Sequence, residues 1–426
     1  MPRRVLLLAL ALVGAAACEQ VAPPPPAPPT EFLVAARDSI FWIRSEADGI
    51  RVRGAPLVVA LVGGRLAELY VTDEDHSFYD AVYVGQRLFK RDLITGDSVQ
   101  LFADTLMRIL ARNYAAANPD EQPLAEEEVG SEDPRIVGSA EILVLDVLGP
   151  WASYEYRTDV DIIGRPSSHG LRRGVLDLRT GVPTTLDALV GSPAAQPIIA
   201  EGQRQWRELR DSTLVAAAGS KDEKLLRTEY ERFSFDPRSF GLEVAAHRPL
   251  VRFSLALSGS LNPLPALQLG PITLDEPAWW PTVLGDYPTT GASEERRWPR
   301  GDYEILARPA AGPAPRVAFA LRDAGGQEWP LGFVPAPVQR VMWLDDSLMA
   351  PGTREALLRA FDDAALYGEE TRVARRSPTA PHAAPRSQAV PQLVPVTHAP
   401  RTFSSPRRHK VVTSLRVPAA NRYVRH

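Results

Sequence analysis

The chain has 426 residues, of which 45% are hydrophobic and 23% charged, so it holds enough apolar material for a globular core. Its length favours two or three domains, and its single cysteine excludes a disulfide within the chain. Charge is uneven: residues 371–426 hold 11 basic residues and no acidic one, whereas residues 19–370 hold 35 basic and 52 acidic residues, a net charge of −17. The composition gives no reason to expect a nucleic-acid partner, a metal or another cofactor.

Residues 1–17 have the order of a secretory signal peptide. Arg3 and Arg4 precede the apolar run Val5–Val13, and small residues follow at positions 14–17. The run is shorter than the roughly 20 residues that a membrane-spanning helix needs. We therefore expect this segment to be removed rather than to cross the membrane.

Cys18 directly follows Ala15-Ala16-Ala17, and this arrangement resembles the lipobox of bacterial lipoproteins. The resemblance implies cleavage before Cys18 and attachment of acyl chains, palmitate among them, which would hold the protein on the membrane. Stable anchoring needs more than one chain. In enterobacterial lipoproteins an aspartate directly after the cysteine is the retention signal. Because Glu19 stands there instead, the resemblance favours the outer membrane and a periplasmic or exterior location. The alternative is an ordinary signal peptide followed by a free thiol.

Residues 18–30 form the predicted anchor and spacer. Six of the seven residues from Pro23 to Pro29 are proline. Such a run favours extended polyproline II and acts as a semi-rigid spacer. We expect it to hold the folded body away from the membrane.

Residues 31–134 are predicted to form a β-rich domain. Runs of β-branched and aromatic residues indicate strands, at 39–44, 56–64, 65–73 and 80–92. Residues 104–117 have helical spacing with Asp104 as the candidate N-cap. The acidic, proline-bearing stretch 118–134 then reads as a linker.

Residues 135–275 are predicted to form an α+β domain. Strands are expected at 139–149, 151–164 and 172–181, and then a short helix at 184–191 with Thr184 as N-cap and a longer one at 194–218. Further strands follow within 232–244 and 249–259. Strands and helices in separate blocks favour mostly antiparallel sheets with a few packed helices rather than a parallel βαβ fold.

Three stretches of this segment resemble a known family: YEYRTDV (154–160), GVLDLRTGVPTTLDALVG (174–191) and RFSFDPRSF (232–240). They are similar to landmarks of the extracytoplasmic domain shared by RsiV-type anti-sigma factors and PdaC-type peptidoglycan deacetylases. The resemblance implies a binding domain, whose ligand in the anti-sigma factors is lysozyme. The paired aspartates of WLDDS (343–347) match the metal motif of the deacetylase domain, but no His-x-x-x-His follows in a predicted folded region, so we expect no deacetylase domain.

Residues 276–368 are predicted to form a hairpin turning at Gly325-Gly326 and a helix from Thr353 to Gly368. Residues 369–426 are basic and proline-rich, and we expect a disordered tail. The tail would contact anionic envelope polymers, lipid head groups or the acidic body. An inert tail, or an out-of-frame reading of a GC-rich gene, is the alternative.

The body holds three histidines that a catalytic or metal site would draw on: His76, His169 and His247. Asp73, Asp75 and Asp80 surround His76 and would suit a divalent cation, but a solvated loop between strands is favoured.

Ser167 and Ser168 beside His169 suggest a nucleophile and base. Catalytic triads are assembled from distant positions, so a polar hairpin loop is favoured there. His247 lies at a strand junction and reads as a loop or edge residue.

Trp279, Trp280 and Tyr287 lie among prolines in DEPAWWPTVLGDYP. Exposed aromatic rings stack on sugars or protein partners, so these three are the candidate ligand contacts. The alternative is that they fill the core.

The leading hypothesis is a lipid-anchored, non-catalytic binding or sensing module of the cell envelope. Its ligand would be peptidoglycan, a lysozyme-like protein or an anionic envelope polymer. One alternative is a hydrolase of envelope polymers that uses carboxylates such as Asp73, Asp75 or Asp177. The other is a structural envelope lipoprotein.

Overall fold

The computed structural model describes residues 27–365, except 37–38, 47–48, 79–80, 105–108, 110–111, 113–115, 117–118, 121–135, 164–167, 222, 233, 246, 255–256, 260–268, 290–294, 313 and 345–348. The predicted signal peptide, Cys18 and the basic tail lie outside the described residues, and so does most of the predicted helix 104–117. None of the helices in the described part of the chain has the length and apolar character that crossing a membrane requires.

Sheet 1 joins the two ends of the described chain. Its order is β20-β1-β2-β3, with bounds β1 Thr30–Ala36, β2 Ile40–Glu46, β3 Gly49–Ala55 and β20 Val338–Trp343. Phe32, Leu33 and Val34 are all fully buried. Successive residues of a strand point to opposite faces, so sheet 1 is covered on both faces.

Sheet 4 covers one face of sheet 1. Its strands pair in chain order: β16 Arg296–Arg300, β17 Tyr303–Ala310, β18 Arg316–Asp323 and β19 Glu328–Pro335. Phe32 and Val34 pack there against Trp298 and Phe319 in one buried cluster. The predicted hairpin at Gly325-Gly326 is confirmed, because β18 and β19 pair antiparallel around that turn.

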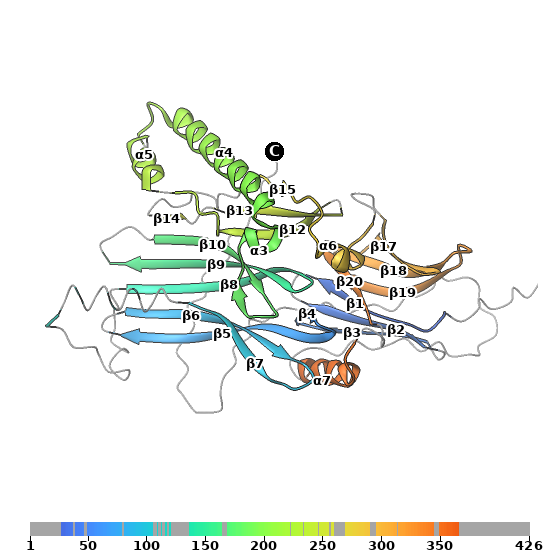
Figure 1. The fold of residues 1–426 in the computed structure, drawn as a ribbon. Coiled ribbons are helices and arrows are strands. Elements are labelled where there is room, and N and C mark those ends of the chain that lie inside the picture. The colour runs from blue at the N-terminus through green and yellow to red at the C-terminus, as the bar shows by residue number, and fades with distance from the viewer. Residues whose placement is uncertain are drawn as a thin grey trace, which may run out of the picture.

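Helix α7 (Thr353–Ala365) covers the other face of sheet 1. Leu33 and Trp42 point to this side, and the rings of Trp42 and Phe361 are 5.8 Å apart. Figure 1 shows α7 below the strands of sheet 1. The predicted helix is confirmed in this range, and its predicted end at Gly368 lies outside the described residues.

Sheet 2 has nine strands, and its main path runs β11-β10-β9-β8-β6-β5-β4, with β14 beside β10 and β7 beside β6. The bounds are β4 Val58–Val62, β5 Arg65–Phe78, β6 Ala81–Asp92, β7 Ser98–Ala103, β8 Ile136–Leu148, β9 Trp151–Ile162, β10 Ser168–Asp177, β11 Val182–Pro183 and β14 Leu257–Gly259.

Strand β6 changes partner along its length. Residues 81–84 pair in parallel with β8, and residues 87–91 pair with β7. Gln86 lies at the change: its side-chain amide accepts from Ile142 N at 2.6 Å and donates to Asp73 at 2.8 Å. The strands of sheet 2 also enclose a separate buried core, which includes Leu69, Leu88 and Tyr154.

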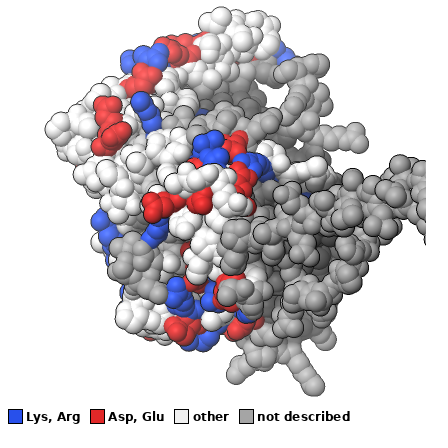
Figure 2. Space-filling model, turned by 90° about the vertical axis from the view of Figure 1, so that its right-hand side faces the viewer, with Lys and Arg blue, Asp and Glu red and all other residues white. Residues whose placement is uncertain are grey.

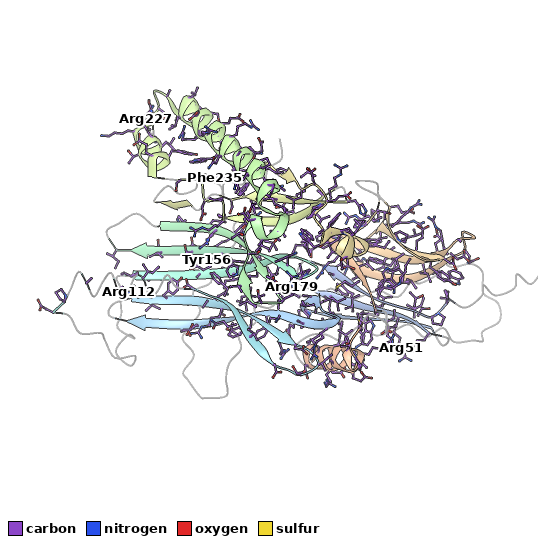
Figure 3. All side chains as sticks on the ribbon, viewed as in Figure 1. Arg51, Arg112, Tyr156, Arg179, Arg227 and Phe235 are labelled. Atoms are coloured by element: carbon purple, nitrogen blue, oxygen red, sulfur yellow. The ribbon has the colours of Figure 1, made fainter. Side chains whose placement is uncertain are left out.

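Sheet 3 and the remaining helices pack on the β8–β10 side of sheet 2 (Figure 1). The bounds are β12 Phe240–Ala245, β13 Arg248–Phe253, β15 Ile272–Thr273, α3 Leu186–Val190, α4 Ser192–Ala217, α5 Glu223–Arg232, α6 Trp280–Val283 and the 3-10 helix η1 Leu284–Asp286. Figure 3 shows Arg227 near the outer end of the α4–α5 hairpin and Phe235 below α4.

Helix α3 begins one residue later than expected. Its N-cap is Thr185, whose hydroxyl accepts from Ala188 N, and not the predicted Thr184. Thr184 N instead donates to Val175 O, which continues the pairing of the preceding strand. The cap therefore falls on the first threonine free of the sheet.

The predicted α+β class of mostly antiparallel sheets with a few packed helices is confirmed, since β6 with β8 is the single parallel pair among the described strands. The domain boundaries at 134 and 275 stay a prediction. Two pairings cross them: β8 joins β6 across the first, and β20 joins β1 from the opposite end of the chain.

Candidate functional site

The aromatic candidates lie in and against the core beside α6. Trp280 and Tyr287 are 2% and 3% exposed, and the Tyr287 hydroxyl donates to Val147 O at 3.2 Å. Trp279 is half-buried, and its Nε1 donates to Leu189 O at 3.0 Å. Trp280 and Tyr287 therefore present no exposed ring face, which the expected stacking on a ligand requires.

The acidic stretch around His76 does not form the expected loop. Asp73, Asp75 and His76 lie inside β5, which pairs with β6 through Phe78, and Asp80 lies outside the described residues. Strand β4 pairs only with residues 65–69 of β5. Among the described residues, the rest of β5 is therefore an edge, where charged side chains oppose pairing with other chains.

His169 lies in β10, not in a hairpin loop, and Ser167 lies outside the described residues. Its Nδ1 is 2.5 Å from Asp159 Oδ1 on the neighbouring strand β9. His247 sits in the tight turn between β12 and β13 with φ of 63°, and its Nδ1 is 3.0 Å from Pro288 O. The prediction of a loop position is thus correct for His247 alone.

Asp177 is separated from the other carboxylates proposed for hydrolysis. Asp177 and His169 lie eight residues apart on β10, a separation of about 26 Å at 3.3 Å per residue. The strand pairing places Asp75 at the same level of sheet 2 as His169, several strands away. Burial opposes its ionisation, but hydrogen bonds from Arg179 prevail and lower the pKa of Asp177. Asp177 and Asp75 therefore cannot act as one acid–base pair.

Metal-binding geometry is absent from the part of the chain that the structure describes, where no three or more His, Cys, Asp and Glu side chains converge. Trp343 ends β20, and the paired aspartates after it lie outside the described residues. Asp104, the predicted helix cap, accepts the hydroxyl of Tyr156. The cap itself is untested, because residues 105–108 are not described.

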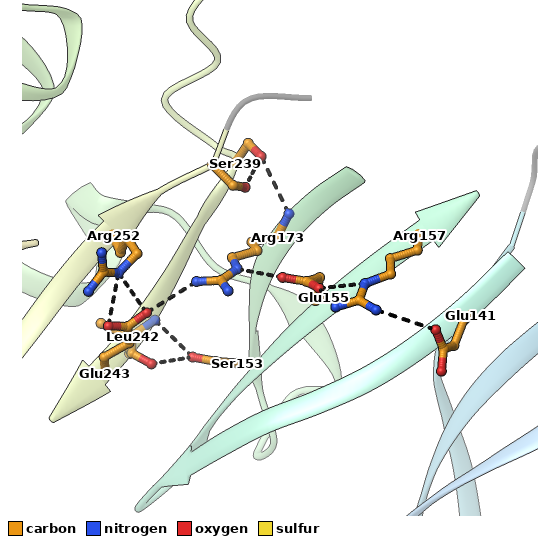
Figure 4. Close-up of polar contacts among 10 residues, drawn as sticks. Glu141, Ser153, Glu155, Arg157, Arg173, Ser239, Leu242, Glu243 and Arg252 are labelled. Carbon is orange, nitrogen blue, oxygen red and sulfur yellow. Dashed lines mark hydrogen bonds and ion pairs between the residues drawn. The ribbon is translucent and has the colours of Figure 1, made fainter. Parts of the chain in front are cut away.

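A chain of ion pairs crosses from sheet 2 to sheet 3 (Figure 4). Glutamates and arginines alternate along it, at separations of 2.6 to 3.8 Å, in the order Glu141, Arg157, Glu155, Arg173, Glu243 and Arg252. Glu155 and Arg173 are buried. Their pairing offsets the cost of removing two charges from water, so the chain fixes how sheet 3 sits on sheet 2.

A second polar group lies where sheets 1 and 2 meet η1. Arg340 of β20 is buried, and its guanidinium donates to Val59 O at 2.5 Å. Burial raises the pKa of Asp146 and raises that of Asp286 to about 6, while the charge of Arg340 opposes both shifts. A cavity of about 10 Å³ lined by Asp146, Gln339 and Arg340 has room for one water at most. This group suits a junction rather than a ligand site.

A concentration of negative charge lies on the exposed side of sheet 2. The strand register places exposed carboxylates on one face of β5, β8 and β9: Asp73, Asp75, Glu141, Asp159 and Asp161. We call these five residues the acidic face. Three of these carboxylates have a polar partner. The Gln86 amide donates to Asp73, His169 contacts Asp159, and Arg157 pairs with Glu141 as well as with the buried Glu155. Five carboxylates against one shared arginine leave the face with a net negative charge.

Two exposed valines lie among the five carboxylates of the acidic face. Val84 lies opposite Asp75, and Val137 lies opposite Asp161, with exposed fractions of 36% and 47%. Figure 2, which looks at the molecule from the right of Figure 1, shows basic and acidic residues intermixed instead. Exposed apolar side chains surrounded by side chains of like charge are typical of a surface that binds a partner of the opposite charge.

Comparisons with known proteins reach only a distant likeness. No protein-family model and no curated protein matches the chain. Among solved structures, the chain is similar to the crystal structure of a DUF3298 family protein from Pseudomonas aeruginosa PAO1. The identity is 10%, the match covers 50% of this chain and 92% of that chain, and the TM-score is 0.25. A likeness at this level carries no argument about function.

Proposed function

We propose that the protein is a lipid-anchored binding or sensing module of the bacterial cell envelope, and that its acidic face binds the basic surface of a protein ligand. The acidic face is the observation that carries the proposal, since five exposed carboxylates and two valines share one side of sheet 2. The same charge disfavours an anionic envelope polymer at this face by repulsion.

The proposed lipid anchor is supported by the sequence and by the position of the first strand. Strand β1 starts at Thr30, directly after the proline run. The 12 residues that follow Cys18, up to Thr30, would span about 37 Å at 3.1 Å per residue in polyproline II. The acidic face would then be carried clear of the lipid head groups.

A lysozyme-like protein is the first ligand to test, because the three sequence landmarks resemble RsiV-type domains and the acidic face has the complementary charge. Those landmarks fall on strand β9, on the β10 turn with α3, and on the segment before β12. Peptidoglycan fragments and envelope extracts are tested beside it.

The experiment measures binding of lysozyme to the purified full chain and to the variant Asp75→Asn, Asp159→Asn, Asp161→Asn. Losing three charges of about 0.5 kcal/mol each should weaken binding about tenfold at 50 mM salt. The difference should shrink at 0.5 M salt, where charges are screened within a few Å.

Exposed aspartates elsewhere provide the matched control, the variant Asp187→Asn, Asp275→Asn, Asp302→Asn. It removes the same charge and should bind like the original chain. Equal binding by both triple variants would contradict the assignment of the acidic face. No binding of lysozyme, peptidoglycan fragments or any extract component would contradict the binding function itself.

A further inference from the structure

The acidic face has a candidate partner within the same chain. Residues 371–426 hold ten arginines and Lys410 without one acidic residue, whereas residues 19–370 carry a net charge of −17. Exposed Val84 and Val137 add apolar area to the same face. Charge of opposite sign on one polypeptide favours contact between the two regions.

The basic segment is long enough to reach the face. Lys410 lies 45 residues beyond Ala365, where α7 ends. A flexible chain of that length has a root-mean-square span of about 37 Å, and a proline-rich extended one reaches about 140 Å. A compact body of this size has a radius of gyration of about 20 Å.

We propose that residues 371–426 bind the acidic face of their own chain and compete there with an external basic ligand; only the competition rests on the proposed function. Tethering through a linker of this length corresponds to an effective concentration of about 1 mM. If the segment alone bound with a dissociation constant of about 0.1 mM, the external ligand would be weakened about tenfold. The segment would thus set the threshold at which the module responds.

Zero-length carbodiimide crosslinking of the full chain tests the contact. The chain has four lysines, and Lys410 is the one within residues 371–426, so each link from the segment's side chains to a carboxylate reports on one amine. We expect Lys410 to link mainly to residues of the acidic face, with a yield at least threefold lower at 0.5 M salt. Exposed Lys221, between α4 and α5, shows that the reagent is active.

A one-to-one mixture of isotope-labelled and unlabelled chains separates contact within a chain from contact between two copies. Links within one chain are expected. Links found only between labelled and unlabelled chains would overturn the proposal in favour of a dimer contact. Links of Lys410 mainly to other carboxylates, or none while Lys221 reacts, would overturn it as well.

Competition is tested with the variant Arg407→Gln, Arg408→Gln. It should lower the Lys410 crosslink yield and raise the affinity for lysozyme three- to tenfold, whereas Arg207→Gln, Arg248→Gln, on exposed parts of the body, should change neither. If lysozyme binds through the acidic face but the tail variant leaves its affinity unchanged, competition is wrong and the proposed function stands. If no ligand binds, the proposed function fails while the crosslinks still decide the contact.

Discussion

Replacing Asp286 by asparagine should stabilise the protein at pH 8 and leave its stability at pH 4 nearly unchanged. Burial raises the pKa of Asp286 from 3.8 to about 6, against the opposing charge of Arg340. The folded state therefore holds the proton more tightly than the unfolded state. This contribution is fully present below pH 3.8 and is lost as the pH rises through about 6.

The magnitude follows from the shift in pKa. About two units, at 1.36 kcal/mol each, give about 3 kcal/mol as the cost of the ionised carboxylate in the folded protein. Asp286→Asn should raise the free energy of unfolding by up to that amount at pH 8. Asp146 keeps its own raised pKa, so the variant retains part of the pH dependence.

The assay is urea unfolding followed by tryptophan fluorescence between pH 4 and pH 8. Asp302→Asn, at an exposed turn, is the matched control and should follow the original curve. Parallel curves for Asp286→Asn and the original chain, or a loss of stability of the variant at pH 8, would refute the reasoning about this buried carboxyl.

Two further predictions use the same unfolding assay. Glu155→Gln removes the buried ion-pair partner of Arg173, which then keeps only the half-buried Glu243, and should cost about 3–5 kcal/mol. Glu141→Gln, at the exposed end of the same chain of charges, should cost less than about 1 kcal/mol; equal losses would show that burial does not govern this chain. Trp280→Ala should cost about 3–5 kcal/mol because its ring fills the core beside α6, and a loss below about 1 kcal/mol would contradict that core position.

Local patterns were sufficient for much of the fold. The alternation of polar and apolar residues in the second half of β9, residues 156–161, reflects one covered and one exposed face, and the apolar spacing of 353–365 predicts α7 correctly. Asp73 to His76 read as a loop because carboxylates are uncommon in strands. Pairing with β6 along 12 residues overrides that preference, since one edge of β5 stays in water.

The acidic face could not be predicted, because it is formed by strands distant in sequence. Asp75 of β5 and Asp159 of β9 share a row of sheet 2 only through the parallel pairing of β6 with β8. Alternation indicates which side of each strand is polar, but not which strands are neighbours. For the same reason, Trp280 and Tyr287 suggest exposed rings in sequence, but they lie in a core cluster with residues of sheets 2 and 3 and of the helices, and the Tyr287 hydroxyl donates to Val147 O.

Mass spectrometry of the mature N-terminus, combined with palmitate labelling, tests the proposed anchor and therefore the location of this binding module. The account predicts a chain that begins at Cys18, carries acyl chains and fractionates with membranes, and a Cys18→Ser variant that loses both label and membrane association. Retention of residues 1–17, a Cys18 free of lipid, or a variant that stays with the membranes would contradict it.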